Sequence, residues 1–257
     1  MTSEIRLAVR GDDLGMAHAV NEGMALAWRH GILSQTTVMA PCPWFAEGAR
    51  LALDLGIPTA VHTTLTAEWE NLRWGPLAGP TTCAQRDGTF HRSIEDVLDH
   101  VRPEDAVAEI DAQVGRIRDT GIEPGGLDPH MGAIATGSVG SIAKRHGLPF
   151  VHGRAGLGMY DSVTMLTHRQ DKMTWLQTWL AGLGPGTHLL VTHPGVDGPE
   201  LAALTDPAAP NHLWAHPGRV TDLAALLDPE VLDVVDRRGI TLVAAFGDGR
   251  AIPTDKA

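Results

Sequence analysis

Two adjacent carboxylates near the N-terminus, Asp12 and Asp13, are the first residues whose chemistry needs an explanation. They follow the apolar run 5–9 and precede a stretch with helical spacing. Like charges side by side repel, and each resists removal from water. A cation beside them would make the pair tolerable, because one carboxylate could bind it while the other moves protons. The structural alternative is that one of them caps the following helix.

Three histidines occupy the same kind of position further along the chain. His62, His130 and His193 each stand at the end of a short apolar run, and Asp128 lies two residues before His130. A lone histidine in such a place is more often a hydrogen-bonded structural residue than a ligand. Three of them, together with the aspartate pair, indicate one common site.

These residue types suit a metal-dependent hydrolase. Two imidazoles and one carboxylate leave coordination positions open for water and substrate, so we assign the metal to Asp13, His62 and His130. The cation would lower the pKa of its water and polarise a substrate carbonyl. Asp12 would then be the general base, and His193 the general acid that protonates a departing amine.

Four further residues are candidates for supporting roles. Asp128 could orient a ligand histidine or the general acid, or it could form a turn before the next proline. Trp69 and Trp74 offer flat indole faces to a sugar ring, and Arg73 could hold a carboxylate or hydroxyl group.

Alternating strand and helix signals would position these side chains. Apolar and β-branched runs predict strands at 5–9, 36–39, 59–62, 126–128, 150–151, 189–192 and 241–244. Helical spacing predicts helices at 20–30, 45–55, 103–120, 138–145, 222–227 and 229–238. This alternation favours an α/β fold whose mainly parallel sheet is covered by helices. The carboxyl ends of parallel strands share one face, where residues far apart in sequence converge.

Residues 63–93 interrupt the alternation with little periodicity and many Trp, Gly and Pro residues. A loop this long is usually functional or mobile, so we expect it to cap the fold, to contact substrate, or to do both. No internal repeat or linker divides the chain, and we predict a single domain over residues 1–257.

Composition limits the partners and the compartment. The formal net charge of -11 argues against nucleic acid and against anionic membrane surfaces. We find no basic-plus-apolar leader and no apolar stretch of about 18 residues. The two cysteines, Cys42 and Cys83, form no C-x-x-C pair. These features favour a cytoplasmic protein with reduced thiols and no membrane partner.

Several short motifs stand in a fixed order along the chain. They are D-D-L-G-M at 12–16 with A-V-N at 19–21, V-H-T-T-L-T at 61–66, L-D-P-H-M-G at 127–132 and T-H-P-G at 192–195. With E-W at 68–69 and R-W-G-P at 73–76, this set resembles the YdjC-like carbohydrate deacetylases of the ChbG group. The best-known activity of that group is removal of acetyl from N-acetylated chitooligosaccharides.

The resemblance implies a distorted (β/α) barrel of the polysaccharide-deacetylase type. It also implies one divalent metal ion on the matching residues Asp13, His62 and His130, with Asp12 as the base, and a homodimer by analogy. Zn or Mg is expected first, and Mn, Fe, Co or Ni also suits these ligands.

We therefore predict a metal-dependent hydrolase that removes an acetyl group from an N-acetylated sugar or oligosaccharide. Three alternatives remain open: hydrolysis of a non-sugar acylated metabolite, a metal-containing sugar-binding module without turnover, and a metal-dependent sugar isomerase. Asp12 and His193 speak against a binding module, because binding alone requires neither a base nor an acid. Thr63, Thr64 and Pro129 depart from the usual family residues and bear on which sugar is bound.

Overall fold

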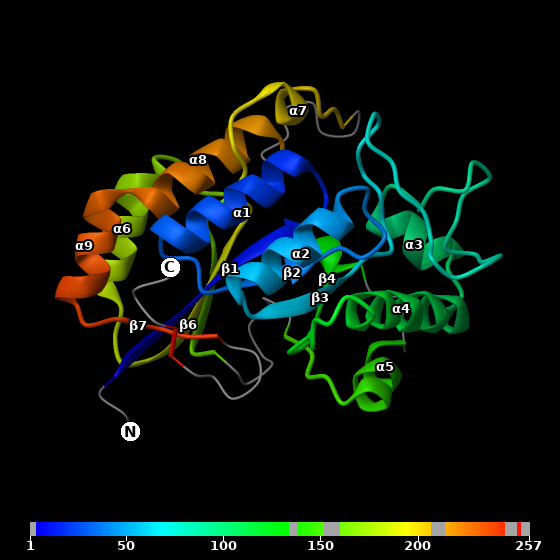
Figure 1. Cartoon of the computed structure of the whole chain (residues 1–257), viewed down its shortest axis with the longest axis horizontal. Helices are drawn as coiled ribbons and strands as arrows, with labels where there is room; N and C mark the ends of the chain where they lie inside the picture. The colour runs from blue at the N-terminus through cyan, green and yellow to red at the C-terminus, as the bar shows by residue number, and fades with distance from the viewer. Residues whose placement is uncertain (1–3, 134–137, 152–159, 207–213, 245–250, 253–257) are drawn as a thin grey trace.

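A curved parallel sheet forms the centre of the computed structural model, which describes residues 4–133, 138–151, 160–206, 214–244 and 251–252 (Figure 1). Its strands are β1 (Ile5–Leu14), β2 (Gln35–Val38), β3 (Thr59–Thr63), β4 (Leu127–Pro129), β5 (Ser162–Met165), β6 (Gly186–Thr192) and β7 (Thr241–Leu242). They follow the order β4-β3-β2-β1-β6-β5, and β7 pairs with β1 beside this path. Every pairing between these strands is parallel, as the alternation of strand and helix signals predicts.

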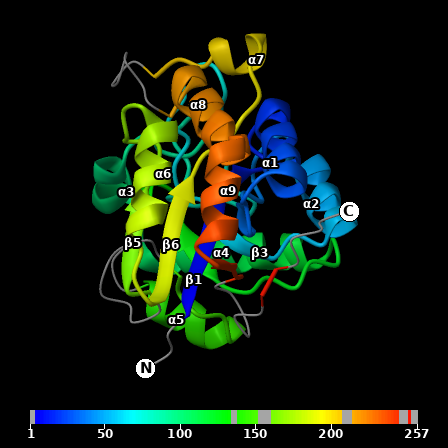
Figure 2. The same ribbon diagram turned by 90° about the vertical axis from the view of Figure 1, so that its left-hand side faces the viewer.

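Helices cover the sheet on the outside, as Figures 1 and 2 show. In this layer α9 packs on α6, α6 on α8, α8 on α1 and α1 on α2, while α4 packs on α5 at the other end. The helices are α1 (His18–His30), α2 (Phe45–Leu55), α3 (Ile94–His100), α4 (Pro103–Arg118), α5 (Ser138–His146), α6 (Lys172–Gly182), α7 (Pro199–Ala202), α8 (His216–Leu227) and α9 (Pro229–Arg237), with a 3₁₀ turn η1 (His130–Gly132). The layers form the distorted α/β barrel that was predicted.

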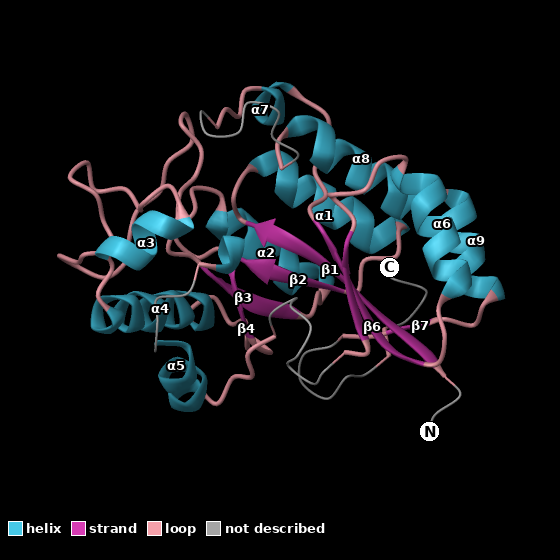
Figure 3. Ribbon diagram, turned by 180° about the vertical axis from the view of Figure 1, so that it is seen from behind, coloured by secondary structure: helices cyan, strands magenta, loops and turns pink. Residues whose placement is uncertain are grey.

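The hydrophobic core lies between the sheet and these helices. β1 runs through its middle, between β2 and β6, as the view from behind in Figure 3 shows. A strand covered on both faces is expected to be apolar throughout. One cluster of buried side chains accordingly joins strands and helices, among them Leu7, Val9, Val61, Leu190, Met24, Ile110, Leu176 and Leu226.

The segment between β3 and α3 contains neither a helix nor a strand, in agreement with the irregular loop predicted there. It is nevertheless well packed, because its large apolar side chains are turned inward. Trp69, Cys83 and Phe90 are fully buried, and Trp74 is 4% exposed. Isolated bridges join Thr66 to His91 and Ala84 to Phe90 within it. The segment thus has a compact interior of its own beside the barrel.

Among the described residues, every helix falls short of the length and apolar character that a bilayer crossing requires.

Candidate metal centre and active site

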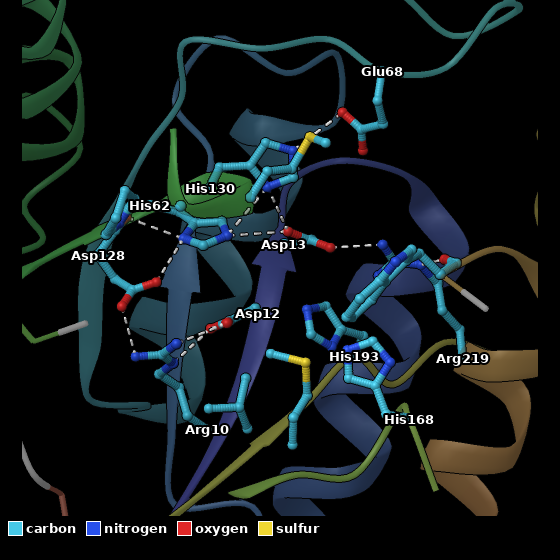
Figure 4. Close-up of a pocket in the computed structure, with 16 residues that line it drawn as sticks. Arg10, Asp12, Asp13, His62, Glu68, Asp128, His130, His168, His193 and Arg219 are labelled. Atoms are coloured by element: carbon cyan, nitrogen blue, oxygen red, sulfur yellow. Dashed lines mark hydrogen bonds and ion pairs between the residues drawn. The ribbon is translucent and has the colours of Figure 1, made fainter. Parts of the chain in front are cut away.

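A cavity of about 330 Å³ lies at the carboxyl ends of the central strands (Figure 4). β1, β3 and β4 bring polar side chains to it, His193 follows the end of β6, and α8 adds an arginine. The cavity gathers the predicted metal-binding, proton-transfer and supporting residues that lie near strand ends: Asp12, Asp13, His62, Asp128, His130 and His193.

The adjacent carboxylates of β1 reach the same cavity because the strand is irregular there. In a regular strand, successive side chains point to opposite faces. The register between β1 and β2 shifts between Gly11 and Leu14, and Asp13 has a φ of 76°. This left-handed conformation is uncommon for a residue with a side chain and turns Asp13 toward the cavity beside Asp12. Neither carboxylate makes the predicted alternative contact, since the cap residue of α1 is Ala17 without a side-chain bond.

Three atoms from different parts of the chain form a small triangle. Asp13 Oδ1 lies 3.2 Å from His62 Nε2 and 3.3 Å from His130 Nδ1, and the two nitrogens are 3.3 Å apart. A circle through atoms this close has a radius of about 1.9 Å, shorter than metal–ligand bonds of about 2.0–2.2 Å, so one ion can touch all three. The donor set therefore fits a divalent cation.

The outer nitrogen of each histidine is held by an acceptor. His62 Nδ1 is 3.2 Å from the carbonyl oxygen of Asp128, and His130 Nε2 is 3.1 Å from Glu68 Oε2. When these nitrogens carry the proton, the inner nitrogens present lone pairs to the centre of the triangle. Acceptors of this kind orient metal-binding histidines in proteins.

The two oxygens of Asp13 differ in their surroundings. Arg219 Nη2 lies 2.6 Å from Oδ2, whereas the buried Oδ1 faces the nitrogens of His62 and His130. Burial alone would raise the pKa of Asp13, but Arg219 and the two histidines hold that pKa well below its usual range. A buried, ionised oxygen that faces two histidine nitrogens needs positive charge beside it, from a cation or from protons on the rings.

Without a cation, protons stabilise the triangle. Burial would lower the pKa of His62, but Asp128 and Asp13 outweigh it and raise this pKa to about 9. Burial opposes protonation of His130 as well, and Glu68 together with Asp13 raises its pKa to about 10. The site thus attracts positive charge strongly.

A second group of three potential ligands, Asp12, His62 and Asp128, already contains a cation from the protein. Arg10 lies between the two carboxylates, with its Nε 2.7 Å from Asp12 Oδ1 and its Nη1 2.9 Å from Asp128 Oδ1. Arg10 Nη1 also donates to the carbonyl oxygen of Val151. The guanidinium fills this position, so the triangle around Asp13 is the better metal site.

His193 belongs to a separate hydrogen-bonded chain. Thr167 Oγ1 donates to Asp222 Oδ2 at 2.6 Å and lies 3.0 Å from His193 Nδ1. Because the hydroxyl proton is used, Nδ1 must be the donor to Thr167, and Nε2 keeps its lone pair. Lys172 balances the buried charge of Asp222. Burial lowers the pKa of His193 to about 4, so the ring is neutral at neutral pH.

The three residues predicted to contact substrate are not among the described residues that line the cavity. Trp69 is fully buried in the segment after β3, where a sugar cannot reach its ring. Arg73 donates to the carbonyl oxygens of Ala67 and Phe90. Trp74 Nε1 donates to the carbonyl of Thr66. Among the described residues that line the cavity, the tryptophan is Trp214.

Sequence reasoning did not identify four further residues of the site: Arg10, Glu68, Thr167 and Arg219. Arg10 stands in an apolar strand, where a charge needs a partner, and this offered a usable signal. Glu68 lies within a family motif but carried no assigned role. Thr167 and Arg219 offered none, because their partners are distant in sequence.

Known proteins resemble this chain over most of its length. A carbohydrate deacetylase of Thermoanaerobacter pseudethanolicus is 26% identical over 256 residues, covering 92% of this chain and 96% of the relative. A carbohydrate deacetylase of Geobacillus stearothermophilus is 28% identical over 249 residues, covering 91% and 94%.

Two solved structures share the fold. A protein of Enterococcus faecalis, described as a candidate for cellobiose-phosphate cleavage, has a TM-score of 0.78 at 21% identity and covers 95% of this chain and 98% of its own. A family 4 carbohydrate esterase of Streptomyces lividans has a TM-score of 0.51 at 14% identity and covers 98% of both chains. The model of the family described as YdjC-like protein matches residues 6–237. The chain therefore belongs to the YdjC-like protein family.

Proposed function

We propose that this protein is a metal-dependent deacetylase that hydrolyses the acetamido group of an N-acetylated sugar or oligosaccharide. The observation that carries the proposal is the common cavity, in which a three-atom ligand set lies beside a buried carboxylate and a buried neutral histidine. The relatives named carbohydrate deacetylase support a sugar as the substrate.

In this proposal Asp13, His62 and His130 hold one divalent cation, which supplies a Lewis acid for the amide carbonyl and a water of lowered pKa. Two nitrogen donors favour Zn²⁺, Mn²⁺, Fe²⁺, Co²⁺ or Ni²⁺ over Mg²⁺ by ligand type. Zn²⁺ and Mg²⁺ are the first ions to test.

Asp12 is the proposed general base, which accepts the proton of the attacking water. Arg10 fixes its orientation through Nη2, 2.9 Å from Oδ2, and Thr37 Oγ1 donates to Oδ1 at 2.9 Å. A carboxylate has about four lone-pair positions, so these contacts and the Arg10 Nε pair leave one for the proton.

His193 is the proposed general acid for the departing amine. Its neutral ring presents the Nε2 lone pair, so it must first take up a proton from the solvent as negative charge builds on the substrate. It then delivers this proton to the amine nitrogen. Asp128 has a supporting role in this proposal. Its carbonyl oxygen orients His62, and its carboxylate binds Arg10.

We also propose a single domain, a homodimer and a cytoplasmic location, on the sequence features given above. The net charge of -11 supports a small-molecule partner rather than nucleic acid or a membrane surface.

Acetate release tests the proposed function directly. The purified protein, loaded with Zn²⁺ or Mg²⁺, is incubated with N-acetylglucosamine oligomers and, in parallel, with N-acetylated amino acids. We expect acetate from the sugars only, and its loss with a chelator. Release from the amino acids alone would favour a non-sugar amidohydrolase, and conserved substrate mass would favour an isomerase.

The Asp12→Asn variant separates an enzyme from a binding module. We expect turnover to fall by about 10²–10⁴-fold, as for loss of a general base, while sugar affinity is retained. If the wild-type protein and Asp12→Asn bind the sugar equally and the wild-type protein shows no turnover, the binding module is favoured.

A further inference from the structure

The two oxygens of Asp13 face different partners. Oδ2 lies 2.6 Å from Arg219 Nη2, and the exposed fractions of the two side chains are 2% and 1%. Oδ1 faces His62 Nε2 and His130 Nδ1 at 3.2 and 3.3 Å. Figure 4 shows the carboxylate lying between the histidines and the arginine. Only one oxygen of Asp13 is therefore directed to the proposed cation site.

Arg219 is itself held in place from several directions. Its Nε donates to the carbonyl oxygen of Trp214, and its own carbonyl accepts from the amide of Gly195 at 3.2 Å. A Cβ atom on Gly195 would come within 3.3 Å of Arg219 Cβ, so the two segments are in close contact. These contacts hold the first turn of α8 and place the guanidinium beside Oδ2.

The backbone of Asp13 restricts the carboxylate as well. Its left-handed φ of 76° and the bond from the amide of Met16 to its carbonyl oxygen, at 3.1 Å, determine where the side chain begins. With the Cβ direction and Oδ2 both determined, rotation of the carboxylate to present two oxygens would break the bond to Arg219.

We propose that Arg219 is a positioning residue that limits Asp13 to one-oxygen coordination and thereby makes the site select against large oxygen-seeking cations such as Ca²⁺. The inference rests on the proposed metal site. Ca²⁺ takes about 6–8 oxygen ligands at about 2.3–2.6 Å and often uses both oxygens of a carboxylate. Zn²⁺ is satisfied by fewer ligands at about 2.0–2.2 Å, histidine nitrogens among them.

The simpler alternative is that Arg219 only balances the buried charge of Asp13. The ratio of two binding constants separates these roles. Loss of the arginine charge changes the electrostatic attraction for any divalent ion by a similar factor, because the ions carry equal charge. That factor cancels in the ratio of Zn²⁺ to Ca²⁺ affinity, whereas a change in the number of coordinating oxygens does not cancel.

The experiment measures Zn²⁺ and Ca²⁺ dissociation constants of metal-stripped protein by competition with a chelating dye. Wild type is compared with Arg219→Gln and Arg219→Lys. Lys172→Met is the matched control, because it removes a buried cation from Asp222, away from the triangle. We expect the preference for Zn²⁺ over Ca²⁺ to fall at least about tenfold in Arg219→Gln, the size of a typical outer-sphere effect, and to persist in the control. We expect Arg219→Lys to lie between them, because a lysine offers a single point contact to Oδ2.

An unchanged ratio in folded Arg219→Gln overturns the inference and leaves the proposed deacetylation intact. If the wild-type protein binds neither Zn²⁺ nor Ca²⁺, both this inference and the proposed metal-dependent deacetylation lose their basis. If Arg219→Gln does not fold, a crystal structure of zinc-loaded wild type decides: zinc on Oδ1 alone, with Arg219 still on Oδ2, supports the role. Zinc bound by both oxygens of Asp13 overturns it.

Discussion

Thr167 and His193 lie 26 residues apart in sequence, and Thr167 Oγ1 is 3.0 Å from His193 Nδ1. Since the hydroxyl donates to Asp222, this contact selects the tautomer of the histidine. The proton transfer proposed for His193 then depends on a residue that is not among those lining the cavity.

Replacement of Thr167 by Val is expected to lower kcat by about 10–100-fold with little change in KM, because the tautomer is no longer selected. Thr167→Ser keeps the hydroxyl and should restore most of the loss. Steady-state acetate-release kinetics on both variants provide the measurement. A rise in KM at constant kcat would contradict the role given to Thr167.

Trp214 and Trp69 lie in different surroundings, so their substitution should have different effects. Trp214 lines the cavity with its ring centroid 4.7 Å from that of His193, while Trp69 is fully buried elsewhere. We expect Trp214→Ala to raise KM for an acetylated oligosaccharide about tenfold, through loss of an apolar face for the sugar. Trp69→Phe should leave KM unchanged and lower the free energy of unfolding by about 1–3 kcal/mol, measured by urea denaturation. A raised KM in Trp69→Phe together with an unchanged KM in Trp214→Ala would instead indicate that the sugar binds against the segment after β3.

Metal binding should release protons. In the metal-free protein, His62 and His130 have pKa values of about 9 and 10, so both rings are protonated at pH 7.5. A cation needs their lone pairs, so each Zn²⁺ bound should displace about two protons. Apparent affinity should therefore rise from pH 7 to 9 and level off above pH 10. An indicator dye in weak buffer gives the proton count, which should fall by one in His62→Asn. Zinc uptake without acidification would contradict these protonation states.

His193 should make the protein sensitive to acid. Its folded-state pKa of about 4 lies below the ordinary value of 6.5, so between these pH values the unfolded chain binds a proton that the folded chain does not. Stability is therefore lost as pH falls through this window, by on the order of 3 kcal/mol at pH 4. His193→Gln should lose less stability than wild type between pH 7 and 4.5 in urea denaturation. Parallel losses in the two proteins would show that His193 is protonated without cost to folding.

Much of the fold could be predicted because its pattern is local. Helices such as α2 have one apolar face and end at a left-handed glycine, here Gly56 with a φ of 64°. α6 was not predicted, because its apolar residues lie all round the helix and Met173 among them is exposed. β1 was predicted to end at Val9 but continues to Leu14, since its buried charges are paired within the protein.

The candidate site was predictable in part, because parallel strands bring their carboxyl ends to one face. Carboxylates and histidines at strand ends converge by topology, and the predicted group of Asp13, His62 and His130 does lie together. The tryptophans were not predictable by type alone, because an indole is equally suited to a sugar platform and to a buried core. Only the packing of the segment after β3 distinguishes Trp69 from Trp214.

Each carboxylate of the adjacent pair has its own guanidinium, and the two come from opposite ends of the chain. Arg10 stands two residues before Asp12 on the same strand, whereas Arg219 is 206 residues beyond Asp13. During synthesis on the ribosome, Asp12 can find its partner as soon as β1 emerges. Asp13 must wait for α8, so in a nascent or truncated chain that lacks this helix the carboxylate proposed to bind the cation lacks the arginine that orders it.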